Sequence, residues 1–184
     1  ASDMASIVQT AITSTAAAGQ ILRIPPGVIR LDSAITIPMG ANIQGPGLPT
    51  DRNGVFSAYN AYFHLNHTGI GFNLIGQGAS SSGGMRRLAG FGTYRNQPAD
   101  TGGWTPTAAS ADVTVTGAYD VTLEDLFFYN ATRAIAVTGD TSSAGYGNGR
   151  ITIRHIRGQP MLYGLKRDIP VIEISNQPGA AKGK

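Results

Sequence analysis

The stretch ILRIPPGVIRLDSAITIPMGANIQGPG, from Ile21 to Gly47, decides the fold. Its segments LRIP, VIRL, AITIP and ANIQ alternate apolar and polar residues over about four positions each, as half-buried strands do. Turn-forming residues separate them, at Pro25-Pro26-Gly27, Asp32-Ser33 and Pro38-Met39-Gly40. The stretch therefore predicts very short strands that follow one another through tight corners, with no room for a helix.

A short amphipathic helix is predicted before this stretch, over residues 3–19. Asp3 is placed to cap its N-terminus, and apolar residues recur at three-to-four spacing between Ile7 and Ile12. Gly19 follows the last helical residue as a C-terminal cap.

A repeat is visible in the second half of the chain. YDVTLEDLFFYNATRAIAV (residues 119–137) aligns with GRITIRHIRGQPMLYGLKR (residues 149–167) at an offset of 30 residues. The alignment pairs Val121 with Ile151, Leu123 with Ile153, Leu126 with Ile156 and Ile135 with Leu165. In each copy the order apolar, polar, apolar, two polar, apolar predicts a strand, a two-residue corner and the next strand. Repeats of roughly 20–50 residues are typical of solenoids.

A meander of hairpins is the alternative to a solenoid, and the turn residues disfavour it. Hairpins place Asn-Gly or Asp-Gly turns directly between strands, but Asn53-Gly54 and Asn148-Gly149 each follow an irregular segment. A parallel β-helix is therefore the preferred interpretation. Each coil would bury its inward Val, Ile and Leu residues against its neighbours, and the helix over residues 3–19 would cover one open end.

The opening segment resembles a known family. A helix, then Ile24, Pro25-Pro26-Gly27, Val28, Ile35, Ile37 and finally Gly45-Pro46-Gly47, is similar to the N-terminal part of pectin-lyase-like right-handed parallel β-helix proteins, bacteriophage tailspikes above all. The resemblance covers residues 3–47 and 112–157. It implies an all-β fold, a right-handed single-stranded parallel β-helix with a short capping helix. It also points to a homotrimer whose partners are other virion proteins and bacterial surface polysaccharide.

The chain is expected to form a single domain over residues 1–176. Residues 3–19 are the capping helix, and residues 21–176 form coils with long loops at 48–62 and 95–111. Residues 177–184 lack apolar periodicity and are expected to be a disordered or artificial tail.

Composition argues against several classes of function. The 14 basic and 11 acidic residues are spread along the chain without a polybasic block, so nucleic acid is not expected as a partner. The chain has no cysteine, and His64, His67 and His155 lack zinc-ligand spacing, so no metal and no cofactor is expected. The sequence contains no run of 18 apolar residues, so membrane insertion is not expected.

Asp120, Glu124 and Asp125 are the candidate catalytic residues, because glycosidic cleavage needs two carboxylates that face one groove. A calcium-dependent lyase site would need an aspartate cluster, and only these three come near one. At an offset of 30 residues Glu124 and Asp125 meet Arg154 and His155. Ion pairing between coils is therefore the competing interpretation of the same carboxylates.

Aromatic residues in predicted loops are the candidate sugar-binding residues, because an aromatic ring can pack on the apolar face of a sugar. They are Trp104, Tyr59, Tyr62, Tyr94 and Tyr146. Packing of the loops on the solenoid wall, or against another subunit, is the alternative. The run Phe127-Phe128-Tyr129 lies in one predicted strand, so at least one ring must point outward.

Three functions stay open on the sequence. The first is a bacteriophage tailspike or tail-fibre component, extracellular on the virion, that binds bacterial surface polysaccharide. The sequence leaves open whether this component also depolymerises the polysaccharide. The second is a purely structural virion appendage or adaptor. The third is a secreted polysaccharide lyase or glycoside hydrolase.

Overall fold

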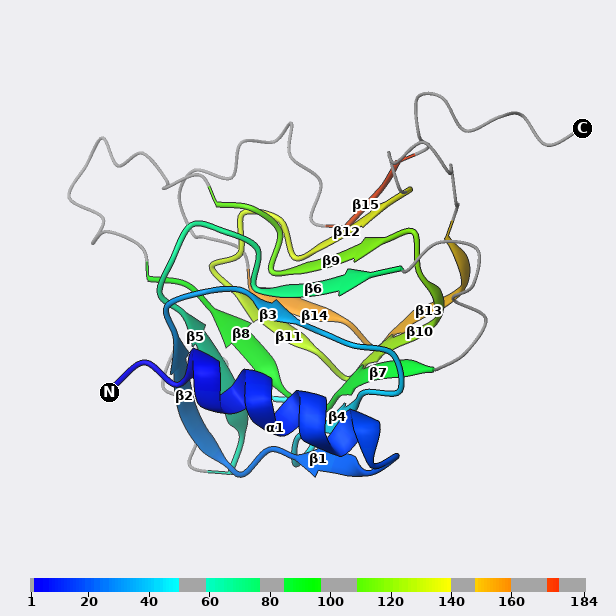
Figure 1. Cartoon of the computed structure of the whole chain (residues 1–184). Coiled ribbons are helices and arrows are strands. Elements are labelled where there is room, and N and C mark those ends of the chain that lie inside the picture. The colour runs from blue at the N-terminus through cyan, green and yellow to red at the C-terminus, as the bar shows by residue number, and fades with distance from the viewer. Residues whose placement is uncertain are drawn as a thin grey trace, which may run out of the picture.

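The computed structural model describes residues 2–49, 59–76, 85–96, 109–139, 148–159 and 172–175. One helix, α1 (Ala5–Ala17), precedes a series of short strands that build three parallel sheets of five strands each (Figure 1). The chain visits the three sheets in turn, because each strand pairs with the strand three places further along. This arrangement is consistent with a parallel β-helix.

Each sheet has one strand from every coil. The first sheet contains β1 (Ile21–Arg23), β4 (Asn42–Gln44), β7 (Arg86–Ala89), β10 (Tyr119–Glu124) and β13 (Gly149–Arg154). The second contains β2 (Gly27–Leu31), β5 (Ala61–Leu65), β8 (Gly92–Tyr94), β11 (Phe127–Tyr129) and β14 (Arg157–Gln159). The third contains β3 (Ile35–Thr36), β6 (Phe72–Ile75), β9 (Val113–Thr116), β12 (Ile135–Thr138) and β15 (Ile172–Ser175).

The strand register confirms the predicted offset in the first sheet and corrects it in the third. Val121 pairs with Ile151 and Leu123 pairs with Ile153, as the repeat requires. Ile135, however, pairs with Ile172, whereas the sequence alignment had paired it with Leu165, which lies outside the described residues. The connection between the second and third sheets causes the difference, because it spans residues 130–134 in one coil and residues 160–171 in the next.

The corner between the first and second sheets has the predicted length of two residues in the last coils, but it lies one residue later than predicted, because Glu124 and Arg154 still belong to β10 and β13. Asp125 (φ 51°) and His155 (φ 52°) start this corner in successive coils, and Gly90 (φ 71°) starts it in the coil before. A left-handed backbone costs most L-residues about 1–2 kcal/mol, but Gly adopts it freely and Asp and His tolerate it better than most residues. The shape of the corner thus restricts which residues can stand there.

The core lies inside the three sheets and is filled by inward-facing apolar side chains. Phe63, Phe72 and Phe91 pack together there, with ring centroids 5.0–5.6 Å apart. Phe128 belongs to the same cluster, whereas its neighbour Phe127 alternates to the outer side of β11. This confirms that the aromatic run presents at least one ring outward, although Phe127 is itself buried.

Helix α1 covers one end of the sheets, beside β1 and β4 (Figure 1), as the sequence predicts. Val8 and Ile12 are buried against the core, but Ile7 is 59% exposed and does not belong to the buried face. Asp3 Oδ1 accepts the backbone N–H of Ala5 at 3.0 Å and also that of Asp32 at 3.0 Å. The N-cap position is thus Met4 and not the predicted Asp3, but Asp3 still binds the first helical N–H and joins the helix to the corner after β2. No helix in the described ranges is long and apolar enough to cross a membrane.

Candidate functional site

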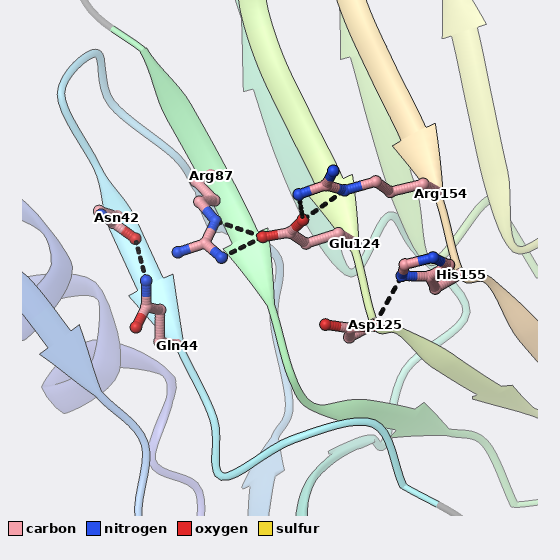
Figure 2. Close-up of polar contacts among 7 residues, drawn as sticks. All are labelled: Asn42, Gln44, Arg87, Glu124, Asp125, Arg154 and His155. Atoms are coloured by element: carbon pink, nitrogen blue, oxygen red, sulfur yellow. Dashed lines mark hydrogen bonds and ion pairs between the residues drawn. The ribbon is translucent and has the colours of Figure 1, made fainter.

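The outer side of the first sheet has a row of polar side chains. Leu123 is buried on the inner side of β10, so alternation places Glu124 on the outer side. Its neighbours there are Arg87 of β7 and Arg154 of β13, and Figure 2 shows both guanidinium groups turned toward its carboxylate. On β4, the Asn42 and Gln44 side chains are joined by a hydrogen bond of 3.3 Å. We call Asn42, Gln44, Arg87, Glu124 and Arg154 the outer polar row.

Glu124 is held between the two arginines. Arg87 Nε donates to Oε1 at 2.6 Å, and Arg87 Nη2 contacts that same oxygen. Arg154 Nε donates to Oε2 at 2.6 Å, and Arg154 Nη2 also contacts Oε2. The Glu124 side chain is only 4% exposed, whereas those of Arg87 and Arg154 are 30% and 58% exposed. The carboxylate is thus the buried centre of the row, and the cations form its surface.

The environment of Glu124 favours its ionised form. Burial alone would raise the pKa of its carboxyl group, but the hydrogen bonds and positive charges of Arg87 and Arg154 outweigh burial and lower the pKa. A general acid needs the opposite shift, because it must keep a proton near neutral pH. Glu124 in this setting is suited to fixing two guanidinium groups in place.

The other two candidate carboxylates are also engaged. Asp120 binds Arg150 through both carboxylate oxygens, and these hydrogen bonds lower the pKa of Asp120. Asp125 Oδ1 lies 3.1 Å from Nδ1 of His155. The predicted pairing of Glu124 and Asp125 with Arg154 and His155 is therefore confirmed. The partnership of Asp120 with Arg150 was not foreseen, although it follows from the same offset.

The candidate sugar-binding aromatic residues are dispersed. Tyr59 is 83% exposed. Tyr94 was expected in a loop but lies in β8, where it is half-buried and stacks on His64 with ring centroids 4.4 Å apart. Trp104 and Tyr146 lie outside the described residues, so their assignment stays a prediction.

Tyr62 requires a correction. It was expected in a loop at 48–62, but it lies in β5 and is only 1% exposed. Its ring packs edge-on against the rings of Tyr94 and Phe127, with ring centroids 6.4 Å apart in each pair. The Tyr62 ring also fills the space beside Gly92, because a Cβ atom on residue 92 would lie 2.4 Å from the ring. β5 therefore begins earlier than the loop prediction allowed, and Tyr62 packs against neighbouring coils.

A buried ionic network was missed by the sequence analysis. Asp112 is fully buried and accepts hydrogen bonds of 2.6 Å from Arg95 Nε and 2.6 Å from the Thr93 hydroxyl. Arg95 is only 3% exposed and also donates to the backbone carbonyls of His67 and Gly69. Residue 95 was assigned to a loop, yet its guanidinium joins the connections of two successive coils.

No metal site is evident in the parts of the chain that the structure describes, because no three His, Asp or Glu side chains cluster there. Comparisons of the chain with protein-family models, with curated protein sequences and with solved structures find no match.

Proposed function

We propose that this chain is a polysaccharide-binding component of a bacteriophage appendage, built as a right-handed single-stranded parallel β-helix. In this proposal the outer polar row binds an acidic polysaccharide of the bacterial surface without cleaving it. The virion setting, the homotrimer and the handedness rest on the resemblance of residues 3–47 and 112–157 to tailspikes and related proteins.

The observation that carries the proposal is the clamp around Glu124. Arg87 and Arg154 each bind the Glu124 carboxylate through their Nε and Nη2 groups. No partner for the Nη1 group of either arginine is found among the described residues. Two cations share one anion, so the cluster has a net charge of about +1. Because the arginines are already fixed, a ligand carboxylate that binds them costs little side-chain entropy.

The neighbouring side chains suit a carbohydrate chain. Asn42 and Gln44 have amide groups that can both donate and accept hydrogen bonds with sugar hydroxyls. They lie on the strand next to β7, so the row extends over β4, β7, β10 and β13. An extended polymer could thus contact several coils at once.

The test uses the purified chain of residues 1–184 and two sets of capsular polysaccharide, one containing uronic acids and one neutral. Binding is followed by calorimetry, sugar release by reducing-end assay, and molar mass by light scattering. We expect a trimer that binds the acidic set and releases no oligosaccharide. Binding to neither set would overturn the proposal and favour the structural appendage, and release of oligosaccharides would favour the enzyme.

A matched pair of variants tests the location of the site. Arg154→Gln and Arg150→Gln remove one positive charge each from the same strand, and both side chains are exposed, but only Arg154 belongs to the clamp. We expect Arg154→Gln to weaken binding of the acidic polysaccharide about tenfold or more and Arg150→Gln to change it little. Equal losses would indicate a general charge effect and argue against the clamp as the site.

A further inference from the structure

A cavity of about 180 Å³ lies where β5 and β8 end, away from the outer polar row. Its polar lining comes from Asn66, His67 and Thr68 after β5 and from Arg95 and Asn96 after β8, and Ala109 closes another side. Pockets for drug-sized ligands usually measure about 300–1,000 Å³. This cavity therefore suits a compact ligand about as large as one sugar ring.

The walls of the cavity are held in place from several directions. The backbone carbonyl of Thr68 accepts the N–H of Ser110 at 2.8 Å, and Asn66 Nδ2 donates to Asp32 Oδ1 at 2.8 Å. Arg95 Nη2 donates to the carbonyl of Gly69 at 2.9 Å. A site fixed in this way needs little ordering when a ligand binds.

The charges around the cavity are compensated within the protein. The Arg95 guanidinium is neutralised by the buried Asp112 carboxylate. Asp32, which holds Asn66, is paired with Arg30 at 2.7 Å. The remaining polar lining groups are amides, a hydroxyl and an imidazole, so the cavity favours a neutral ligand with hydroxyl groups over an anion.

His67 adds an unsatisfied polar group. Its Nε2 atom is buried and has no hydrogen-bond partner in the described structure. Burial, and next the charge of Arg95, lower the pKa of His67, so its imidazole is neutral at pH 7. A buried polar atom without a partner costs about 1–3 kcal/mol. A ligand hydroxyl can remove that cost once the imidazole turns toward the cavity, and such side-chain rotations are common on binding.

We propose that this cavity binds a single neutral sugar ring, with hydrogen bonds from Asn66, Thr68, Asn96 and His67. The site is separate from the outer polar row and goes beyond the acidic-polysaccharide proposal. Tyr94, which immediately precedes Arg95, stacks on His64 beside this end of the second sheet. An aromatic residue expected to bind sugar thus adjoins the cavity without lining it.

The experiment follows the histidine ring nitrogens by NMR in the full chain labelled with ¹⁵N-histidine. The protein has three histidines, and His155, at the corner after β13, serves as an internal control. The methyl glycosides of glucose, galactose and mannose are titrated separately. We expect at least one to shift the His67 nitrogens saturably while those of His155 stay unchanged.

Two comparisons sharpen the result. Ala109→Phe fills the cavity without changing its polar groups, and we expect it to weaken binding about tenfold or more. Methyl glucuronide, which has the same ring with a carboxylate, should also bind about tenfold or more weakly, because the cavity has no uncompensated cation for it. Arg154→Gln should leave the His67 response unchanged, which separates this proposal from that for the outer polar row.

Several outcomes would overturn the proposal. They are a His67 signal that none of the three neutral glycosides moves, an unchanged titration in Ala109→Phe, and an equal affinity for the glucuronide. A His67 shift of the same size with glycerol would show that the cavity takes any small polyol and would overturn the assignment to a sugar ring.

Discussion

Replacing Asp112 by Asn should destabilise the protein strongly, although the two side chains have nearly the same shape. Asp112 is fully buried and Arg95 is 3% exposed, and an arginine stays protonated at any ordinary pH. The substitution therefore leaves a buried positive charge without its counterion. Breaking a buried ion pair in this way costs about 3–5 kcal/mol, against about 5–15 kcal/mol for the whole stability of a domain.

Urea unfolding at pH 7, followed by circular dichroism, measures the loss. With an m-value of about 2 kcal/mol/M, the expected cost lowers the unfolding midpoint by about 1.5–2.5 M. Asp120→Asn is the control, because it removes the same charge from an ion pair in which Arg150 is 71% exposed. Its effect should be much smaller, since water can solvate the arginine that remains.

The double variant Asp112→Asn with Arg95→Met separates charge from shape. Removing both charges should cost less than the sum of the two single substitutions, because neither group is then left buried alone. The reasoning is refuted if Asp112→Asn lowers the midpoint no further than Asp120→Asn, or if the two single losses simply add.

Three further predictions concern other parts of the chain. Asp125→Gly should be more stable than Asp125→Ala by about 1 kcal/mol, because φ is 51° there and neither residue keeps the contact with His155; urea unfolding compares them. Gly45→Ala should lower the melting temperature sharply, since its Cβ would lie 2.1 Å from the Gly90 carbonyl oxygen; calorimetry would contradict this by finding no change. The lowered pKa of Glu124 means that its ionisation stabilises the fold above the unfolded pKa of about 4.3 and that this contribution is lost as pH falls through the lower folded pKa. The stability difference between wild type and Glu124→Gln should therefore shrink in urea titrations as the pH is lowered below that range, and a difference independent of pH would contradict the assignment.

The sequence was informative wherever alternation and repetition coincide. The strands of the first coil, the capping helix and the pairing of Glu124 with Arg154 all follow from local pattern and the offset of 30 residues. β7 and β8 were missed, because RRLA begins with two arginines and strands this short have little periodicity. Arg86 nonetheless points inward, and its guanidinium donates to the carbonyls of Ile37 at 3.2 Å and Ile75 at 2.9 Å.

The ionic network and the cavity could not be predicted from the sequence, for a different reason. Arg95 and Asp112 lie 17 residues apart, and nothing in their local sequence shows that they meet. Their contact depends on how the connections of successive coils stack, which alternation within a strand does not specify. The offset of Ile135 was wrong for the same reason, because connection lengths differ from coil to coil.

Because these connections differ in length, the number of residues in a coil does not determine how its strands align with those of the next coil. The passage from the second sheet to the third takes residues 32–34 in the first coil, residues 95–112 in the third and residues 130–134 in the fourth, yet β3, β6, β9 and β12 stay in one continuous ladder. Segments can therefore be lengthened, shortened or exchanged at this edge while the hydrogen bonding of the wall is preserved. For an engineer the edge is a row of insertion points along a rigid support, provided that each insertion leaves intact the Arg95–Asp112 network that ties the connections of two coils together.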